Sequence, residues 1–137
     1  AMDPLASKGF WAGQRPFGDP TPRPHDGQVA AITRARIKPR LMTTFWRAVP
    51  PVSSRLHASP GLLLSLGIGE APLGLQGTFS LWESAEALRD FAYRSREHRH
   101  AIARTRETGW YSEDLFARFA VTSVRGSFAG QGYAAIR

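Results

Sequence analysis

His98 is the residue whose type and position best fit metal chemistry. It lies in the stretch 84–110, where apolar and small residues recur at spacings of three and four, as on one face of a helix. This spacing predicts that His98 points inward, between Phe91 and Ile102. A single imidazole in an apolar pocket has two interpretations. It is either a core histidine hydrogen-bonded to a nearby polar group, or an axial ligand of a haem iron.

The remaining histidines do not indicate any other metal site. His25, His57 and His100 show no spacing typical of a zinc site, and the chain has no cysteine. Zinc needs three or four clustered donors, while iron–sulfur clusters and thiolate-ligated haem need cysteine. His100 is about 200° around the helix from His98 and is expected to face solvent.

The elements that must position His98 follow from hydrophobic periodicity and from Gly and Pro breaks. In chain order they are a strand at 29–37, a helix at 39–56, strands at 62–68 and 75–82, the helix at 84–109 and a strand at 115–124. The order strand, helix, strand, strand, helix, strand predicts an α+β fold of the ferredoxin-like type, an antiparallel sheet with both helices on one face. Small domains of this plan cover the other face by pairing two sheets, so a homodimer of the dimeric α/β barrel type is expected.

Two segments flank the predicted domain at 28–125. Residues 1–27 are rich in Pro and Gly and are expected to form an extended arm without a core of its own, and 126–137 a loose tail. The arm sequence GFWAGQ at 9–14 is echoed by GSFAGQ at 126–131. The echo is either chance in Gly- and Ala-rich sequence or the relic of a preceding repeat's tail. The opening Ala1-Met2-Asp3-Pro4 resembles an expression remnant, because a translated chain normally starts at methionine.

Composition predicts one globular domain and narrows the list of partners. The 137 residues are 42% hydrophobic and 21% charged, which is ordinary for such a domain. The net charge of +7 raises nucleic acid as a partner, but the arginines are spread over several elements and no basic motif with stacking aromatics is present. No nucleic-acid partner is therefore expected. No apolar run has the length of a membrane span and no signal-peptide pattern is seen, so a cytoplasmic protein is expected.

Several segments resemble a known family. They are WAGQRPF, AITRARIKP, FWRAVPPVS, LGIGEAPLGLQGTFSLW and FAYRSREHRHAIARTRETGWYSEDLFARF. Together, from residue 9 to residue 130, they are similar to the C-terminal half of the spheroidene monooxygenase family of bacterial carotenoid ketolases and its shorter relatives. The resemblance implies a haem-dependent enzyme that uses iron to activate oxygen, and the family histidine before the Ala-Ile step matches His98. The ketolase is about twice as long, so carotenoid oxidation does not follow from the likeness.

The resemblance gives the other candidate residues their roles. A haem would lie between the helix at 84–109 and the sheet, with His98 as proximal iron ligand. The residues expected around it are Phe79, Phe91 and Ile102 as the apolar wall, Arg34 or Arg118 as the cation for a propionate, and Gln76 as the polar group nearest a distal oxygen ligand. The alternative for both arginines is a surface or interface ion pair, and for Gln76 a position on the sheet surface.

The expected function is a haem-binding oxidoreductase, monooxygenase-like, that acts on a small organic or isoprenoid-like substrate and takes electrons from a donor. Two alternatives stay open. One is a cofactor-free oxygenase of the same dimeric fold, in which the substrate itself reduces oxygen and His98 acts as the base. The other is a haem carrier or sensor without enzymatic activity.

Overall fold

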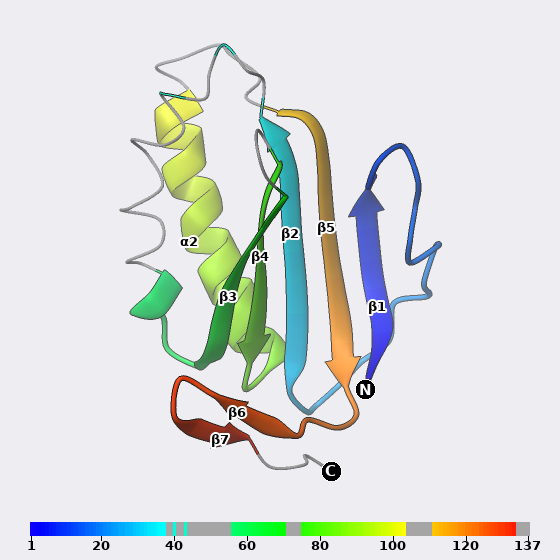
Figure 1. Cartoon of the computed structure of the whole chain (residues 1–137), viewed down its shortest axis with the longest axis vertical. Helices are drawn as coiled ribbons and strands as arrows, with labels where there is room; N and C mark the ends of the chain where they lie inside the picture. The colour runs from blue at the N-terminus through cyan, green and yellow to red at the C-terminus, as the bar shows by residue number, and fades with distance from the viewer. Residues whose placement is uncertain (38–39, 41–42, 44–55, 71–74, 104–110, 134–137) are drawn as a thin grey trace.

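The computed structural model describes residues 1–37, 40, 43, 56–70, 75–103 and 111–133 (Figure 1). The elements in this part of the chain are β1 (Met2–Gly9), β2 (Val29–Ile37), β3 (Leu62–Glu70), β4 (Leu75–Trp82), helix α2 (Ala85–Ala103), β5 (Tyr111–Val121), β6 (Gly126–Phe128) and β7 (Gln131–Tyr133). The helix predicted at 39–56 lies almost entirely outside the described residues. None of the described helices is long and apolar enough to cross a membrane.

A five-stranded antiparallel sheet forms the body of the molecule. Its strand order is β1-β5-β2-β4-β3, and every neighbouring pair is antiparallel. The run β5-β2-β4-β3 is consistent with the predicted ferredoxin-like order, and β1 is an additional strand at the edge of β5 (Figure 1). The prediction of an α+β fold with an antiparallel sheet is confirmed.

Helix α2 begins where its capping residue predicts. The Ala87 amide donates a hydrogen bond to Ser84 Oγ at 3.1 Å, and Glu86 lies in the first turn near the positive end of the helix dipole. Leu88 and Phe91 then pack against the sheet. The helix thereby covers one face of the sheet, which we call the helix side.

Trp82, at the end of β4, is the largest side chain in the helix-side core. It is 0% exposed, its indole N–H donates to Ser80 Oγ at 2.8 Å, and its ring centroid lies 5.2 Å from that of Phe91. Val29 and Ala31 of β2 belong to the same cluster. A buried indole of this size, with its N–H satisfied, fixes how the helix sits on the sheet.

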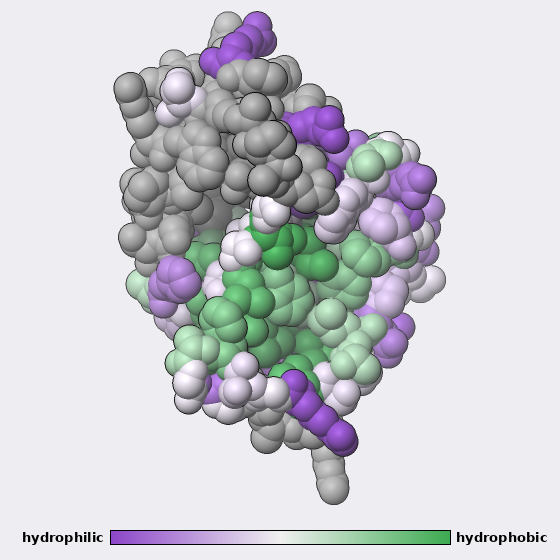
Figure 2. Space-filling view, in the orientation of Figure 1, coloured by the Kyte–Doolittle hydropathy of each residue, from purple (hydrophilic) through white to green (hydrophobic). Residues whose placement is uncertain are grey.

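The opposite face of the sheet, which we call the open face, carries a second apolar cluster. Its buried residues are Ala30, Leu81, Ala117, Phe119 and Val121, with Phe17, Ile32, Leu63, Leu64, Phe79 and Val124 packed against them. Figure 2 shows apolar side chains gathered over the middle of the sheet. Both faces are apolar because successive strand residues point to opposite sides, and β2, β4 and β5 carry apolar residues at both parities.

The N-terminal arm differs from the prediction, because its first residues join the sheet. Strand β1 runs along β5 from Met2, opposite Val121, to Gly9, opposite Leu115. Leu5 is 1% exposed and belongs to the helix-side core. The prediction rested on the Pro and Gly content of 1–27 as a whole, and Pro4 is the proline that falls inside β1. Pro4 lies at an irregularity in the pairing of an edge strand, where proline is tolerated.

The C-terminal segment also differs from the loose tail that was predicted. Its residues 126–133 form a hairpin in which β6 pairs with β7, and the turn is made by Ala129 and Gly130 with φ of 50° and 80°. Positive φ at both central residues is typical of the tight turns that connect antiparallel strands.

We expect Trp82→Ala to lower the free energy of unfolding by about 3–5 kcal/mol, because it removes the largest buried side chain and leaves a cavity between α2 and β4. Tyr93→Ala is the matched control, since Tyr93 is an aromatic residue of α2 that is 62% exposed and should change stability by less than about 0.5 kcal/mol. Urea denaturation followed by far-ultraviolet circular dichroism measures both. Similar losses in the two variants would contradict the assigned core.

Candidate functional site

Arg34, one of the predicted site residues, lies in a polar cluster at the end of the sheet. It is 4% exposed, and its Nη1 donates to Glu113 Oε1 of β5 at 3.0 Å. Its guanidinium carbon lies 4.5 Å from the ring centroid of Trp11, which comes from the arm. A buried guanidinium thus has both a carboxylate partner and an aromatic face, the two contacts that offset the cost of burying it.

The Glu113 carboxylate also binds the backbone of the arm. The Ala12 amide donates to Oε1 and the Gly13 amide to Oε2, both at 2.9 Å. These two amides, and then Arg34, hold the pKa of Glu113 below its ordinary range, while burial acts in the opposite direction. Glu113 therefore stays charged and joins β5, β2 and the arm at one point.

The arm reaches Glu113 because its backbone turns sharply there. Trp11 and Gln14 pair across a turn in which Ala12 and Gly13 have φ of 52° and 73°. Gly9 enters this turn with φ of 97°, and a Cβ there would lie 2.1 Å from the Asp114 carbonyl oxygen. Only glycine allows so close an approach to β5.

Phe79 and Phe91 do not form one wall, which corrects the predicted haem pocket. Phe91 packs on Trp82 on the helix side, whereas Phe79 belongs to the open-face cluster. Side chains alternate along β4, so Phe79 and Trp82, three residues apart, point to opposite sides. A group bound between α2 and the sheet can contact Phe91 but not Phe79.

The two candidate arginines are separated in the same way. Arg118 lies between Ala6 and Ala31 in the sheet, and Ala31 faces the helix side. Arg34 has the opposite parity in β2 and is paired with Glu113, which matches the ion-pair alternative left open for it. The Nε atom of Arg118 is buried and has no hydrogen-bond partner among the described residues. Arg118 is therefore the helix-side cation of the two.

Three predicted site residues are placed only by their backbones. His98 and Ile102 lie in α2, about two and three turns after Phe91, and Gln76 lies in β4 opposite Ala35. Their side chains are outside what the structure describes, so their assigned roles stay predictions. No group of three or more His, Asp or Glu side chains that could hold a metal ion occurs among the described residues.

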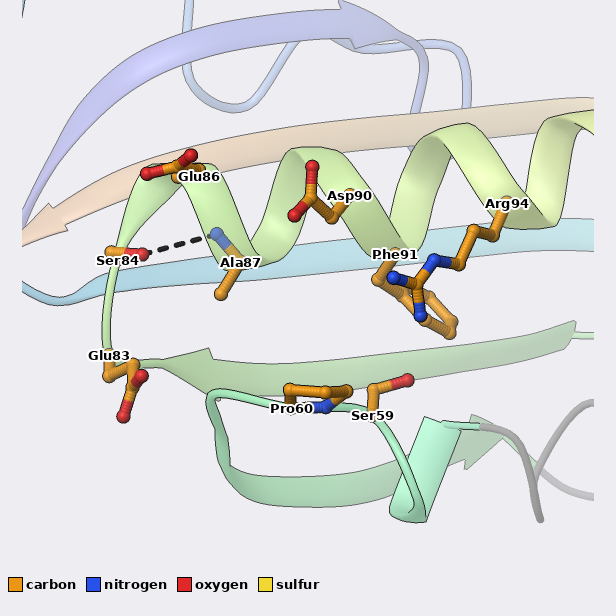
Figure 3. A pocket seen from close by; sticks show the side chains of 9 residues that line it. All are labelled: Ser59, Pro60, Glu83, Ser84, Glu86, Ala87, Asp90, Phe91 and Arg94. Carbon is orange, nitrogen blue, oxygen red and sulfur yellow. Dashed lines mark hydrogen bonds between the residues drawn. The ribbon is translucent and has the colours of Figure 1, made fainter.

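A pocket of about 240 Å³ lies beside the start of α2 (Figure 3). It is lined by Ser59, Pro60, Glu83, Ser84, Glu86, Ala87, Asp90, Phe91 and Arg94. Three of these residues are acidic and one, Arg94, is basic, and the pocket volume suits a molecule much smaller than a haem. This pocket is not the haem pocket predicted around His98 and Ile102. The side chains of those two residues lie outside the described part of the chain, so the haem pocket stays a prediction.

Neither Glu113 nor Trp11 was predicted as a site residue, although each lies in a segment that carries the family resemblance. The signal available in sequence was the pair of glycines around Trp11 and two adjacent acidic residues, Glu113 and Asp114, just before an apolar run. This signal does not show that Trp11 and Glu113 lie close together. The two residues are about a hundred positions apart, and only the register of β1 on β5 brings them to one place.

We expect Glu113→Gln to release the arm turn and to flatten the acid dependence of stability. The pKa of Glu113 in the folded state is below its unfolded-state value of about 4.3. The carboxylate's contribution to the free energy of unfolding is therefore complete above about pH 4.3, and it is lost as the pH falls through the folded-state pKa. The variant should be less stable at neutral pH, and its stability should fall less steeply below about pH 4.3. Thermal unfolding at several pH values measures this, with the adjacent Asp114→Asn as control. A steep acid loss that persists in Glu113→Gln would contradict the assignment.

Comparison with known proteins identifies the family of this domain and several similar proteins. The family model described as a domain of unknown function, DUF3291, matches residues 28–121. Spheroidene monooxygenase of Rhodobacter capsulatus is 38% identical over 95% of this chain and 55% of its own length, and that of Rubrivivax gelatinosus is 38% identical over 95% and 49%. The protein of the same name from Cereibacter sphaeroides is 31% identical over 95% and 40%.

The chain spans about half the length of the curated relatives it matches. No solved structure is similar enough to count as a match. The match of the family model covers the sheet from β2 to β5 together with α2, so the arm and the C-terminal hairpin lie outside it. This chain belongs to the DUF3291 domain family, and it resembles spheroidene monooxygenases over nearly its whole length.

Proposed function

We propose that this chain is part of a monooxygenase-like oxidoreductase that acts on a small organic or isoprenoid-like substrate. The observation that carries the proposal is its similarity, across 95% of its residues, to three proteins named spheroidene monooxygenase. The chain covers only about half of each relative, so the activity of those proteins comes to this chain as part of the proposal.

In this proposal a haem lies on the helix side of the sheet. Arg118 supports that side, because its buried Nε without a described partner is what a cation awaiting an anionic group would show. His98 follows Phe91 by two turns of α2, about 10 Å along the helix axis. His98 would ligate the iron and Arg118 would pair with a propionate, while Phe79 and Arg34 serve other contacts on the open face.

The haem iron would supply oxygen activation when bound, and the chain's own residues would hold it and keep water away. Trp82 and Phe91 form the dry part of the helix side that the structure describes. Gln76 belongs to the same parity of β4 as Ser80 and Trp82, so its position in the strand is on the helix side. The proposed role of Gln76 as a hydrogen-bond donor near oxygen is compatible with that position.

A second candidate is a cofactor-free oxygenase, favoured by the small and acidic pocket beside α2. In such an enzyme an electron-rich substrate would itself reduce oxygen, and His98, which follows the last residue lining the pocket by one turn of α2, would take a proton from the substrate. The pocket volume of about 240 Å³ suits a substrate of a few heavy atoms more readily than a haem.

We also propose that two copies pair through the open face. Ile32, Leu64 and Phe79 are only partly buried there, and apolar side chains cover the middle of this face (Figure 2). Contiguous apolar surface of this kind marks an interaction site. Pairing two such sheets would bury the partly exposed side chains of both copies.

The haem proposal predicts a Soret band when haemin is added to the purified chain, retained in His100→Ala and lost in His98→Ala, because only His98 would ligate iron. His100→Ala is the matched control, a histidine removed two residues away in the same helix. Absorption spectra of the three proteins decide it. No specific band in any of them would refute haem binding and favour the cofactor-free oxygenase, and an equal band in all three would refute ligation by His98.

The pairing proposal predicts that Phe79→Glu turns a dimer into a monomer, because it places a charge in the proposed interface. Sedimentation velocity gives the mass, and circular dichroism shows whether the variant is folded. Phe116→Glu is the control, since Phe116 is 40% exposed and has the helix-side parity of β5. A monomer already in the unaltered chain, or equal dissociation in both variants, would refute the open face as the interface.

A further inference from the structure

The sequence echo between arm and tail is also an echo of backbone shape. In GFWAGQ and in GSFAGQ, the first glycine has positive φ, 97° at Gly9 and 131° at Gly126. The turn residues agree more closely, with 52° and 73° at Ala12 and Gly13 and 50° and 80° at Ala129 and Gly130. Each turn closes by strand-like pairing of the aromatic residue before it with the glutamine after it.

An alanine with positive φ is unfavourable by roughly 1 kcal/mol, so keeping one in both turns calls for a reason. In the arm that reason is visible. The conformation presents the amides of Ala12 and Gly13 side by side to one carboxylate, at 2.9 Å each. Trp11, just before them, lies over the guanidinium that pairs with the same carboxylate.

The C-terminal turn has the same groups, and they contact no carboxylate in the described part of the chain. The amides of Ala129 and Gly130 donate to no other described residue, and Phe128, the counterpart of Trp11, is 46% exposed. Arg125 precedes Gly126 as Lys8 precedes Gly9. The tail therefore carries a complete second version of the element that binds Glu113.

This turn cannot serve the chain's own Glu113 without damage to the core. In the arm, Ala6 pairs with Arg118 and Gly9 pairs with Leu115. The tail motif lies 117 residues after the arm motif, so the tail residue equivalent to Ala6 is Ser123. If the tail docked on its own β5 in the same way, Ser123 would have to lie opposite Arg118. The chain would have to reverse within 119–122, which pulls three buried residues, Phe119, Ala120 and Val121, out of the sheet. The site that the turn fits is therefore on another copy of the domain, one whose Glu113 is not held by its own arm turn as it is here.

We propose that the C-terminal turn, Phe128–Gln131, is a second carboxylate-binding turn that docks on the arginine–glutamate pair of a second copy of this domain. The arm would be the counterpart of such a tail, received by this copy. The lengths agree with this arrangement: the family model spans only 28–121, the two motifs lie on either side of it, and the relatives are about twice as long as this chain.

The first test asks whether the tail sequence can bind Glu113 at all. The two motifs differ only at their second and third residues, so the double substitution Phe10→Ser and Trp11→Phe gives the arm the tail's turn sequence. We expect the Ala12 and Gly13 amides to stay protected from hydrogen exchange and the Glu113 carboxyl to keep its lowered pKa, both read by NMR. The control Ala12→Pro cannot adopt the required φ and lacks the amide, so it should lose both signatures. Loss of both in the double variant would overturn the proposal.

The second test asks whether the tail docks on another copy. Isotope-labelled unaltered chain is mixed with unlabelled Ala12→Pro chain, whose Glu113 has lost its own turn. The labelled signals of 128–131 should shift saturably, and Glu113→Gln in the unlabelled chain should weaken the binding by roughly tenfold or more. Docking would be overturned if the signals of 128–131 stay unchanged although the first test shows that the tail sequence binds Glu113. If circular dichroism shows that Ala12→Pro does not fold, Gly13→Val replaces it as the acceptor, because a β-branched residue is strained at the φ of 73° that the arm turn requires; the same two outcomes apply.

Discussion

The alternation of side chains across one sheet is the constraint on which the rest of this structure depends. Trp82 and the residues in step with it face α2, and the residues between them face the other way. Both sides of the sheet are apolar, so the chain builds two cores on one set of strands. The placement of every candidate site residue in a strand follows from its parity alone. Any chemistry proposed here must choose one side, because no strand residue reaches both.

The contact between Glu113 and the arm is the second feature that organises the fold. It joins residues about a hundred positions apart in the sequence by hydrogen bonds of 2.9 Å. One carboxylate accepts hydrogen bonds from two arm amides and from Arg34, so it ties β2, β5 and the entering chain together. The charge is stabilised mainly by backbone amides. Such a contact depends on the shape of the turn more than on the identity of its side chains, which is why the tail can carry a second version with a different aromatic residue.

Local patterns were enough to predict much of the fold. Strands β2, β3 and β4 lie where alternation and glycine breaks indicated, and α2 begins after Ser84 as its capping hydroxyl predicts. The sequence also shows that Phe79 and Trp82 point opposite ways, but not which of them meets the helix. That choice belongs to packing, and the buried Trp82 decides it. The pairing of Glu113 with Ala12 spans 101 positions and depends on strand register, which no local window contains.

Strand β1 protects one edge of the sheet from aggregation with other chains. An uncovered edge strand presents a row of free amides and carbonyls that can pair with any extended chain, and natural sheets protect such edges. Here β1 covers β5, the longest strand of the described sheet, and the Glu113 contact holds the end of β1 in place. The arm therefore works as a guard against strand-to-strand aggregation. The arm turn is held by the charged Glu113 carboxylate. Acid that neutralises this carboxylate would weaken the attachment of β1 and expose the edge of β5 to other chains.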